Sequence, residues 1–421
     1  MTFQIALTGI NAASTELDTI SNNIANNATT GFKRSRAEFA DVYATSASSS
    51  SGSTVGQGVR VANIRQEHTQ GDMLFTDRNL DLAVEGLGFF QVDDDGTANY
   101  TRSGNFGLND EGYIVDNTGN KLQGYGVDTK AEIVPIVTDL QIDYSDLQPN
   151  RSTTVELTAN LDSKAEATTP ITVTAADGTQ ETVTFSPAYS STYNFSTSTL
   201  VYDSLGSSEV ANIYFQKGTD TSWTAYVYVG DQEISDDGGV QLNFDSSGLL
   251  TDINGGSTTF QSNEYAPASG GASNMSLLFD FAEITQFDDA FGVNRISQDG
   301  FSAGRLEDFD INETGIIFGR FSNGQAKTMG QVTLSNFANE SGLRQVGSTS
   351  WTETYNSGEP ATGAPGSASL GSVQSGALEG SNVDITQELV SMIGAQRSFQ
   401  ANAQVISTGD TLTQTVINIR R

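Results

Sequence analysis

Two seven-residue apolar repeats, one at each end of the chain, constrain its fold more than any other feature. The repeat near the start runs through Phe3, Ile10, Leu17 and Ile24, and the repeat near the end runs through Ile385, Met392, Phe399 and Ile406. Such a repeat places one apolar stripe along a helix, and that stripe needs a partner helix to cover it. The pattern therefore predicts two terminal helices that bring both ends of the chain together, an architecture suited to assembly.

The residues around the repeats predict where these helices begin and end. The first helix is expected over residues 3–27, with Ile20 added to its stripe, asparagines weakening its far end and Gly31 as its stop. The second helix is expected to begin near Asp384, which is a plausible N-cap with Gln387 three residues later.

The stripe of the second helix is wider than a strict repeat. It also contains Leu389, Ala403 and Val416, and it drifts toward Leu412 and Ile419. A drift of this kind means that the helix meets more than one neighbour or unwinds locally. Because two short helices rich in small residues are marginal on their own, we favour packing between copies of the chain over pairing within one chain, and both interpretations stay open.

The middle of the chain has the pattern of β-structure. From about Leu80 the apolar period changes to two, and turn signals separate the apolar runs at residues 95–96, 111–112, 118–119 and 322–325. Residues 108–114, 244–250 and 311–317 resemble one another, which we interpret as one turn type used repeatedly. The acidic insert 147–285 contains the candidate strands ITVTA, ETVTFS, ANIYFQK, WTAYVYVG and VQLNF.

Two low-complexity segments interrupt this pattern. Residues 45–54 are almost all Ser, Ala, Gly and Thr, and residues 356–377 are rich in Gly, Ser, Ala and Pro. The first is expected to be a flexible connector, and the second a linker that returns to the C-terminal helix.

The charge is strongly acidic and unevenly distributed. The formal net charge of the chain is −31, and residues 151–300 alone carry 20 acidic and 4 basic side chains. Nucleic acid and anionic membrane surfaces require clustered Lys and Arg, so both are disfavoured as partners. The terminal segments are nearly neutral, so copies of them can pack together without like-charge repulsion, while the acidic middle stays hydrated.

Several classes of site and of targeting signal are disfavoured by composition. The chain has no cysteine and one histidine, His68, so disulfides, thiolate metal sites and His-rich metal sites are not expected. The start lacks the pattern of a secretory signal peptide, and no apolar run approaches the length of a membrane helix. We expect a chain that is cytoplasmic, or that is exported without a cleavable signal.

The acidic pairs do not have the pattern of a catalytic or metal site. The pairs at residues 93–95, 236–237 and 288–289 lie mostly in turns beside glycine, where Asp is favoured for local hydrogen bonding. The frame from Gln91 to Gly96 begins with Gln and has Arg102 where a calcium-binding loop needs its closing Glu. We therefore expect no enzyme activity, no catalytic residue, no metal and no cofactor, and incidental calcium stays open.

Five segments of the chain resemble the flagellar rod and hook family, in the order in which that family has them. They are residues 21–33 (SNNIANNATTGFK), 84–90, 101–106, 377–384 and 395–402. The residues that carry the first of these motifs are Asn22, Asn23, Asn26, Gly31 and Phe32. The large insert, with YDSLG at 202–206, and GRFSNGQ at 319–325 are similar to the hook branch, whereas distal rod members are markedly shorter.

The resemblance implies a mixed α and β, multidomain fold. The two terminal helices would form a coiled-coil-like inner domain, and the β-rich middle and outer domains would be discontinuous in sequence. The expected boundaries are 1–29 with 382–421 for the helical domain, 30–75 with 366–381 for connecting segments, 76–146 with 286–365 for the middle domain, and 147–285 for the outer domain.

The resemblance also implies a structural role in the bacterial flagellum. The subunit would self-assemble, in many copies, into a curved and flexible tube that acts as a universal joint between rod and filament. The implied partners are the rod, hook cap and hook–filament junction proteins, and the type III export apparatus that carries the subunit outside the cell. The alternatives are a distal rod subunit and, in another class, a secreted β-rich adhesin or carbohydrate-binding protein with exposed aromatics at Trp223, Tyr226 and Tyr228. A glycoside hydrolase is the most distant alternative.

Overall fold

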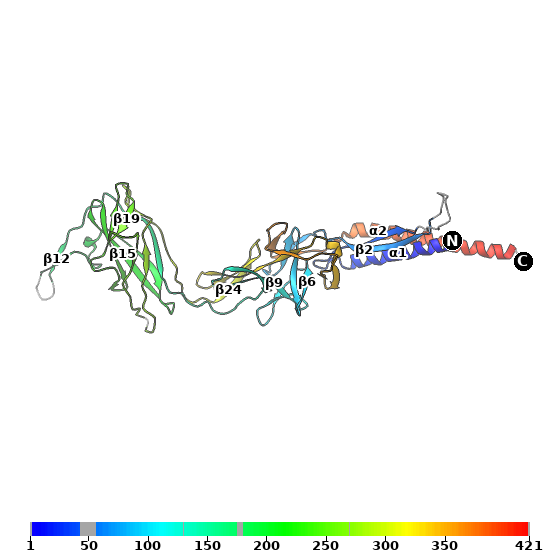
Figure 1. Ribbon diagram of the computed structural model, residues 1–421, viewed down its shortest axis with the longest axis horizontal. Coiled ribbons are helices and arrows are strands. Elements are labelled where there is room, and N and C mark those ends of the chain that lie inside the picture. The colour runs from blue at the N-terminus through cyan, green and yellow to red at the C-terminus, as the bar shows by residue number, and fades with distance from the viewer. Residues whose placement is uncertain (1, 43–55, 129, 175–179, 269, 420–421) are drawn as a thin grey trace. The chain divides into compact units, whose positions relative to one another are not determined.

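The computed structural model describes residues 2–42, 56–128, 130–174, 180–268 and 270–419. It is a mostly β-rich, multidomain chain with a helix at each end (Figure 1). Two compact units divide the chain: unit 1 comprises Met1–Tyr144, Asp308–Arg320 and Ala326–Arg421, and unit 2 comprises Ser145–Glu307 and Phe321–Gln325. The low-complexity run at 45–54 lies outside the described residues.

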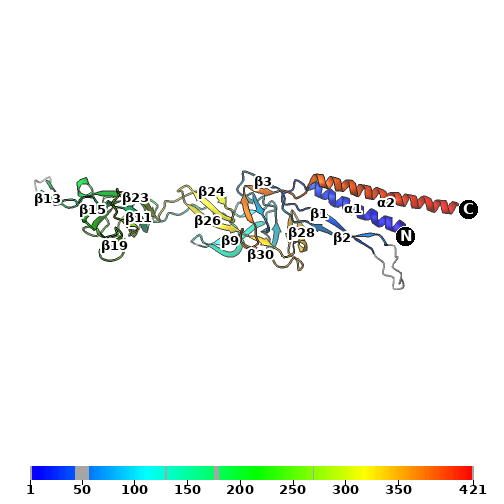
Figure 2. The same ribbon diagram turned by 90° about the horizontal axis from the view of Figure 1, so that it is seen from above.

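Both long helices belong to unit 1. Helix α1 spans Thr2–Ala25 and helix α2 spans Ile385–Ile419. They lie side by side and antiparallel in both side views, so their free ends point the same way (Figure 2). The prediction of Asp384 as N-cap is confirmed, because its Oδ1 accepts the backbone N–H groups of Thr386 and Gln387 at 2.8 and 3.2 Å.

The end of α1 differs from the sequence prediction. The helix ends at Ala25, not at residue 27, and Gly31 lies six residues beyond it with φ +68°. The side chain of Asn26 donates to the carbonyl of Asn22 at 2.9 Å, which is the local competition that makes asparagine a poor helix former. Gly31 is therefore not a helix stop.

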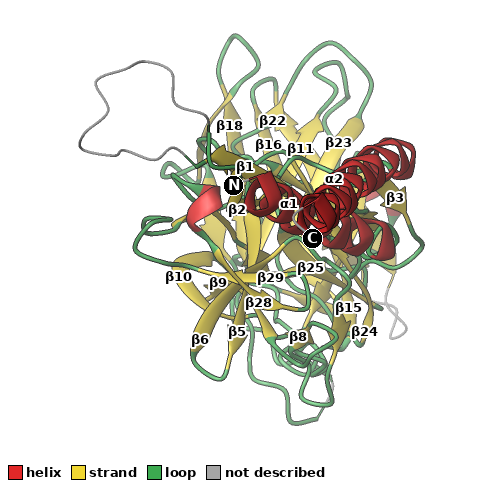
Figure 3. Cartoon of the chain, turned by 90° about the vertical axis from the view of Figure 1, so that its right-hand side faces the viewer, coloured by secondary structure: helices red, strands yellow, loops and turns green. Residues whose placement is uncertain are grey.

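A β-hairpin covers one side of α1. Strands β1 (Ser35–Asp41) and β2 (Val59–Gln66) pair antiparallel, and the end view shows α1 between this hairpin and α2 (Figure 3). Helix α1 is thus held on two sides within unit 1.

The largest sheet of unit 1 follows the order β24-β25-β26-β9-β5-β6-β29-β28. These strands span Leu306–Ile311, Ile316–Phe321, Ala326–Val332, Lys121–Val127, Phe89–Asp94, Thr97–Thr101, Ser350–Thr352 and Arg344–Gly347. Attached to it are β7 (Gly107–Leu108), β8 (Ile114–Val115), β10 (Ile133–Asp139), β27 (Leu334–Asn336) and β30 (Ala361–Gly363). A cluster of edge-to-face aromatic rings forms part of its core: Phe89, Tyr100, Phe337 and Trp351.

The segment expected to be a return linker is structured instead. Residues 356–377 contain β30, β31 (Ser372–Ser375) and the start of β32 (Ala377–Glu379). Strand β31 pairs with β4 (Leu82–Glu85), and β32 pairs with β3 (Met73–Phe75). The linker prediction is wrong because small residues also allow strands to approach closely: a Cβ on Gly371 would lie 2.1 Å from the carbonyl oxygen of Glu85.

Unit 2 contains two larger sheets. One has the order β14-β15-β16-β18-β19, with β17 beside β16; these span Phe195–Tyr202, Ser208–Thr219, Ser222–Val229, Val240–Phe244, Leu250–Ile253 and Gln232–Glu233. The other joins β20 (Thr259–Gln261), β21 (Leu278–Asp280), β11 (Thr154–Asn160), β22 (Ile284–Thr285) and β23 (Gly292–Gln298). A hairpin of β12 (Ile171–Thr174) and β13 (Gln180–Val183) accompanies them. The five candidate strands of the acidic insert are all present.

One apolar core joins the two sheets of unit 2. Alternate residues of β11, such as Val155 and Leu157, and of β16, such as Trp223, point into it, as a period of two requires. Trp223 is 0% exposed and Tyr226 is 7% exposed. The interpretation of these two side chains as exposed aromatics is therefore wrong. Trp223 points into the core, whereas Tyr226, on the opposite face of β16, stacks on Phe185 and donates a hydrogen bond to Gln216.

One turn recurs in both units, as the sequence predicts. An Asn or Asp side chain accepts the backbone N–H groups two and four residues later, and the residue three positions on has positive φ. The turn occurs at Asn109, Asp116, Asp128, Asp203, Asp245 and Asn312. The copies at Asn109, Asp245 and Asn312 are those that the sequence comparison identified. The hairpin predicted at 322–325 joins β25 to β26.

Candidate assembly interface

The two terminal helices meet through small residues. On α1, Ala6, Ala12 and Ala13 are buried, and on α2 Ala395 is buried. Gly9 faces Asn402, whose side-chain atoms lie 2.7–2.8 Å from the position of a Cβ on Gly9. A larger residue at position 9 would require the side chain of Asn402 to move, because that side chain already fills the space.

The predicted stripe of α1 lies partly within this contact. Ile20 is 5% exposed, whereas Ile10, Leu17 and Ile24 are half-buried. Phe3 is 53% exposed near the free end of the helix. The stripe is thus only partly covered by the chain itself.

The predicted stripe of α2 divides between two faces. Met392, Ala403 and Ile406 are half-buried. The other predicted residues are exposed by more than a third: Ile385, Leu389, Phe399 and Val416. Helix α2 continues unbroken to Ile419, so local unwinding does not explain the drift of its stripe.

Further exposed apolar residues on α2 were missed by the sequence reasoning. They are Val390, Ile393, Val405 and Ile417. The first three, with Leu412 and Ile419, give α2 a second apolar face, whereas Ile417 lies on the side of the first stripe. Every residue from 411 to 419 is exposed. The sequence pattern that could have revealed this face was a second set of apolar residues beside the first stripe. Helix α2 therefore carries an extended apolar surface that no described residue of this chain covers.

The motif residues lie at the base of α1. The side chain of Asn23 is 1% exposed and makes two hydrogen bonds with the backbone of Ser35, at 2.8 and 2.9 Å. Phe32 is buried, and Gly31 packs so closely that a Cβ there would lie 2.5 Å from the backbone nitrogen of Ser103. These three residues therefore attach α1 to the β-rich part of unit 1.

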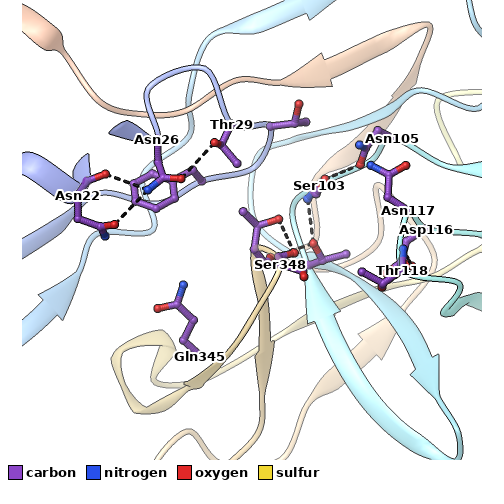
Figure 4. Close-up of a pocket in the computed structure, with 14 residues that line it drawn as sticks. Asn22, Asn26, Thr29, Ser103, Asn105, Asp116, Asn117, Thr118, Gln345 and Ser348 are labelled. Atoms are coloured by element: carbon purple, nitrogen blue, oxygen red, sulfur yellow. Dashed lines mark hydrogen bonds between the residues drawn. The ribbon is translucent and has the colours of Figure 1, made fainter. Parts of the chain in front are cut away.

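The remaining motif residues line a polar pocket of about 420 Å³ (Figure 4). Asn26 donates to Asn22 and accepts from Thr29, and on the opposite wall Ser103 donates to Asn105 at 2.6 Å. Apart from Phe32, the lining consists of amides and hydroxyls with one carboxylate, Asp116, whose Oδ1 is engaged in its own turn. The pocket thus offers neutral hydrogen-bonding groups.

A buried ion triad lies next to these motif residues. Glu379, at the end of β32, is 0% exposed; Lys33 and Arg102 are 1% and 2% exposed. One carboxylate oxygen of Glu379 lies 2.6 Å from Lys33 Nζ, and the other lies 3.0 Å from Arg102 Nη1. The backbone N–H of Gly71 also donates to this carboxylate, at 3.0 Å. Sequence reasoning missed the triad, because its three members lie far apart in the chain.

The electrostatics of the triad follow from its burial. Burial lowers the pKa of the Lys33 ammonium, and the neighbouring Glu379 carboxylate opposes that effect. His68 packs edge-on between Phe89 and Trp351, and burial together with the charges of Lys33 and Arg102 lowers its pKa to about 4. His68 is therefore neutral at neutral pH.

Hydrogen bonds around the triad tie the two terminal segments together. The backbone N–H of Gly31 donates to the carbonyl of Glu379 at 2.8 Å, and that of Arg34 donates to Asn382 Oδ1 at 2.7 Å. Arg34 also reaches Gln387 on α2 at 3.2 Å and pairs with Glu67 at 2.6 Å. Both helices are thus anchored by one network.

Membrane-spanning helices and metal clusters are both missing from the described residues. Among these residues, no helix is long and apolar enough to cross a membrane. In the same part of the chain, no three His, Cys, Asp or Glu side chains are grouped so as to hold a metal ion.

Models of four protein families match successive parts of the chain. Residues 3–33 match "Flagella basal body rod protein", and residues 83–160 match "Flagellar hook protein FlgE/F/G D1 domain". Residues 160–301 match "Flagellar basal body protein FlaE D2 domain", and residues 374–419 match "Flagellar basal body rod FlgEFG protein C-terminal". The order agrees with the order of the motifs in the sequence.

Curated relatives match along the whole chain. The flagellar hook protein FlgE of Escherichia coli is 36% identical over 432 residues, covering 100% of both chains. The hook protein of Borreliella burgdorferi is 31% identical over 451 residues, covering 98% of both. The crystal structure of the Helicobacter pylori hook protein FlgE2 has a TM-score of 0.53 and 16% identity, covering 73% of this chain and 100% of the other. The structural likeness supports the fold.

Proposed function

The chain belongs to the flagellar hook protein family, and on that premise we propose how its copies build a hook. The single observation that carries the proposal is the second apolar face of α2, which the described part of the chain leaves uncovered. In a tube, α1 and α2 of neighbouring copies cover that face and each other, which removes apolar surface from water. The hook formed in this way is a curved, flexible universal joint between rod and filament.

The proposed arrangement has three layers. Residues 1–29 with 382–421 form a coiled-coil-like inner layer, which 30–75 and 366–381 connect to the β-rich middle domain of 76–146 and 286–365. The fold differs from this division at one boundary, because β23 (Gly292–Gln298) pairs with β11 in unit 2. The acidic domain, 147–285, forms the outer layer. Its negative charge keeps the surface hydrated, so contacts between neighbouring outer domains can exchange as the tube bends.

The proposed interface residues are those of the two stripes. They are Phe3, Ile10, Leu17, Ile20, Ile24, Ile385, Leu389, Met392, Phe399, Ala403, Ile406 and Val416. Exposed members such as Phe3 and Val416 would contact a neighbouring copy. The half-buried members would contact both the other helix of the same chain and a neighbouring copy.

The proposed setting is the flagellum outside the cell. The subunit passes through the type III export channel without a cleavable signal, and it contacts rod, hook cap and hook–filament junction proteins. Its role is structural, with no catalytic step and no cofactor. A distal rod subunit is not favoured, because the hook proteins match the chain over its full length, insert included.

Electron microscopy of assembled protein tests the proposal. The full-length chain, concentrated in precipitating salt, is expected to form curved tubes, and a chain trimmed to residues 30–380 is expected to stay monomeric because it lacks both stripes. Straight tubes would favour a rod-like lattice. Tubes from the trimmed chain would show that the helices do not drive assembly.

A further inference from the structure

A two-stranded hairpin stands apart from the two larger sheets of unit 2. Among the described residues, strands β12 and β13 pair only with each other, and Figure 1 shows β12 beyond the larger sheets. An isolated hairpin is at best marginally stable in water. The contacts at its base, where the chain enters near Thr168 and leaves at Thr184, are therefore the ones that can fix its direction.

One buried amide meets both sides of this base. Gln216 lies on β15 with its side chain on the face opposite the core, and it is only 9% exposed. Its Nε2 lies 2.9 Å from Thr168 Oγ1 and 3.0 Å from the carbonyl oxygen of Thr184. A third acceptor, the carbonyl oxygen of Thr192, lies 2.9 Å from the same nitrogen. The side chain thus connects both sides of the hairpin to the sheet behind it.

Tyr226 on the neighbouring strand β16 orients this amide. Its hydroxyl donates to Gln216 Oε1 at 3.1 Å, which leaves the NH₂ group facing the three acceptors. The Tyr226 ring also stacks on Phe185, with ring centroids 3.7 Å apart and 2° between the ring planes. Because Phe185 directly follows Thr184, the same tyrosine holds both the amide and the end of the hairpin.

A second amide holds the first side of the base alone. Asn194 Nδ2 donates to the carbonyl of Glu166 at 2.8 Å, and its Oδ1 accepts the backbone N–H of Lys217 at 2.8 Å. Of these two amides, Gln216 is the one that reaches both sides. Loss of its donors would also leave buried oxygens without a partner, which is costly.

We propose that Gln216 is the positioning residue of the hairpin, and that its amide fixes the direction in which β12 and β13 leave unit 2. Each copy of the chain then presents the hairpin in the same way. The role lies within unit 2, so it does not depend on the terminal helices or on the proposed tube.

Hydrogen exchange of the full-length chain tests this role with Gln216→Glu. At pH 7 the new carboxylate has no donor for Thr168, Thr184 or Thr192, so exchange in 166–174 and 180–194 should be about tenfold faster. Exchange in β11 and β23, in the other sheet of unit 2, should stay unchanged. At about pH 4 the carboxyl group is protonated and regains a donor, so the excess over the parent chain at the same pH should fall.

The matched control is Gln241→Glu. Gln216 and Gln241 are both register partners of Thr224, so they share one row and one face of the sheet, but Gln241 is exposed. The control adds the same charge and should leave exchange in 166–174 and 180–194 unchanged at both pH values. Equal exchange in the two variants, or an excess that does not fall with pH, would overturn the proposal.

A second variant separates release of the hairpin from unfolding of unit 2. If Gln216→Glu speeds exchange in both sheets, Gln216→Met fills a similar volume without donors or charge. Faster exchange confined to 166–174 and 180–194 in this variant would support the positioning role. Unchanged exchange there, or faster exchange throughout unit 2 again, would overturn it.

Discussion

His68 lies against two cations and two aromatic rings, and this position makes it a source of acid sensitivity. Its pKa of about 4 in the folded chain lies below the ordinary value of 6.5 because burial, Lys33 and Arg102 all disfavour a third positive charge. Above pH 6.5 the ring is neutral in both folded and unfolded chains. Between pH 6.5 and pH 4 the His68 ring binds a proton in the unfolded chain but stays neutral in the folded chain, so the free energy of unfolding falls as pH falls.

Replacing this residue is expected to remove that loss. His68→Phe keeps an aromatic ring between Phe89 and Trp351 but cannot titrate. Relative to the variant, the parent chain should lose about 3 kcal/mol of unfolding free energy between pH 7 and pH 4, at about 1.4 kcal/mol per pKa unit. Urea unfolding at both pH values, followed by fluorescence of Trp351 in a Trp223→Phe background, measures the difference. If the unfolding free energy of both chains depended equally on pH, His68 would not be the source of the acid sensitivity.

The recurring turn provides a test at the scale of single elements. In its copy at Asp128, the position of positive φ is occupied by Ala131 (φ +60°), whereas the copy at Asp116 has Gly119 (φ +92°). A left-handed conformation costs a residue with a side chain about 1–2 kcal/mol. Part of this is offset because glycine is more flexible when unfolded.

Exchanging these residues should shift stability in opposite directions. Ala131→Gly is expected to stabilise unit 1 by about 0.5 kcal/mol, and Gly119→Ala to destabilise it by about 1 kcal/mol. A Cβ on Gly119 meets no atom within 4 Å, so the second change reports backbone conformation alone. Thermal unfolding of both variants measures the two changes in stability. Changes of the same sign would argue that the two turns do not share one conformation.

Helix α2 permits a direct test of its exposed face. Val416→Asp and Phe399→Asp place a charge where 64% and 37% of the side chain is exposed in the single chain. We expect both variants to fold normally as monomers but to lose tube formation, because an unpaired charge would be buried between copies. Gln414→Asp adds the same charge to the same exposed segment but on the side of the helix opposite Val416, and should still assemble. Sedimentation and electron microscopy measure the outcome; normal tubes from Val416→Asp would remove that residue from the interface.

At the scale of the whole molecule, the acidic middle sets the conditions for assembly. Residues 151–300 carry a net charge of −16, so copies that assemble bring like charges together. Raising ionic strength from about 0.01 M to about 0.15 M shortens the Debye length from about 30 Å to about 8 Å and screens this repulsion. Light scattering at pH 7 should therefore show faster tube formation at the higher salt. Sucrose of equal osmolality controls for solute effects, and a rate that is unchanged or lower in salt would contradict the argument.

Features with a local cause could be predicted from sequence. Asp384 is an N-cap because its side chain reaches N–H groups two and three residues away. The recurring turn needs only an Asx residue and, three positions later, a residue of positive φ, which is glycine in every copy except that at Asp128. The strands of the acidic insert follow from their apolar period of two. The predicted stop at Gly31 failed because that glycine serves a contact with Ser103, which is distant in sequence.

The two helices, the strands, the repeated turn and the family could all be predicted from sequence, because periodicity, turn chemistry and motif order depend on residues close together in the chain. Which faces are covered depends on the folded arrangement. Folding buries Trp223 in the core between the two sheets of unit 2, leaves Val416 exposed on α2, and brings Lys33 and Arg102 to the carboxylate of Glu379. The physical reason is that burial and ion pairing depend on which distant segments meet. A local sequence pattern does not show which distant segment will pack against it.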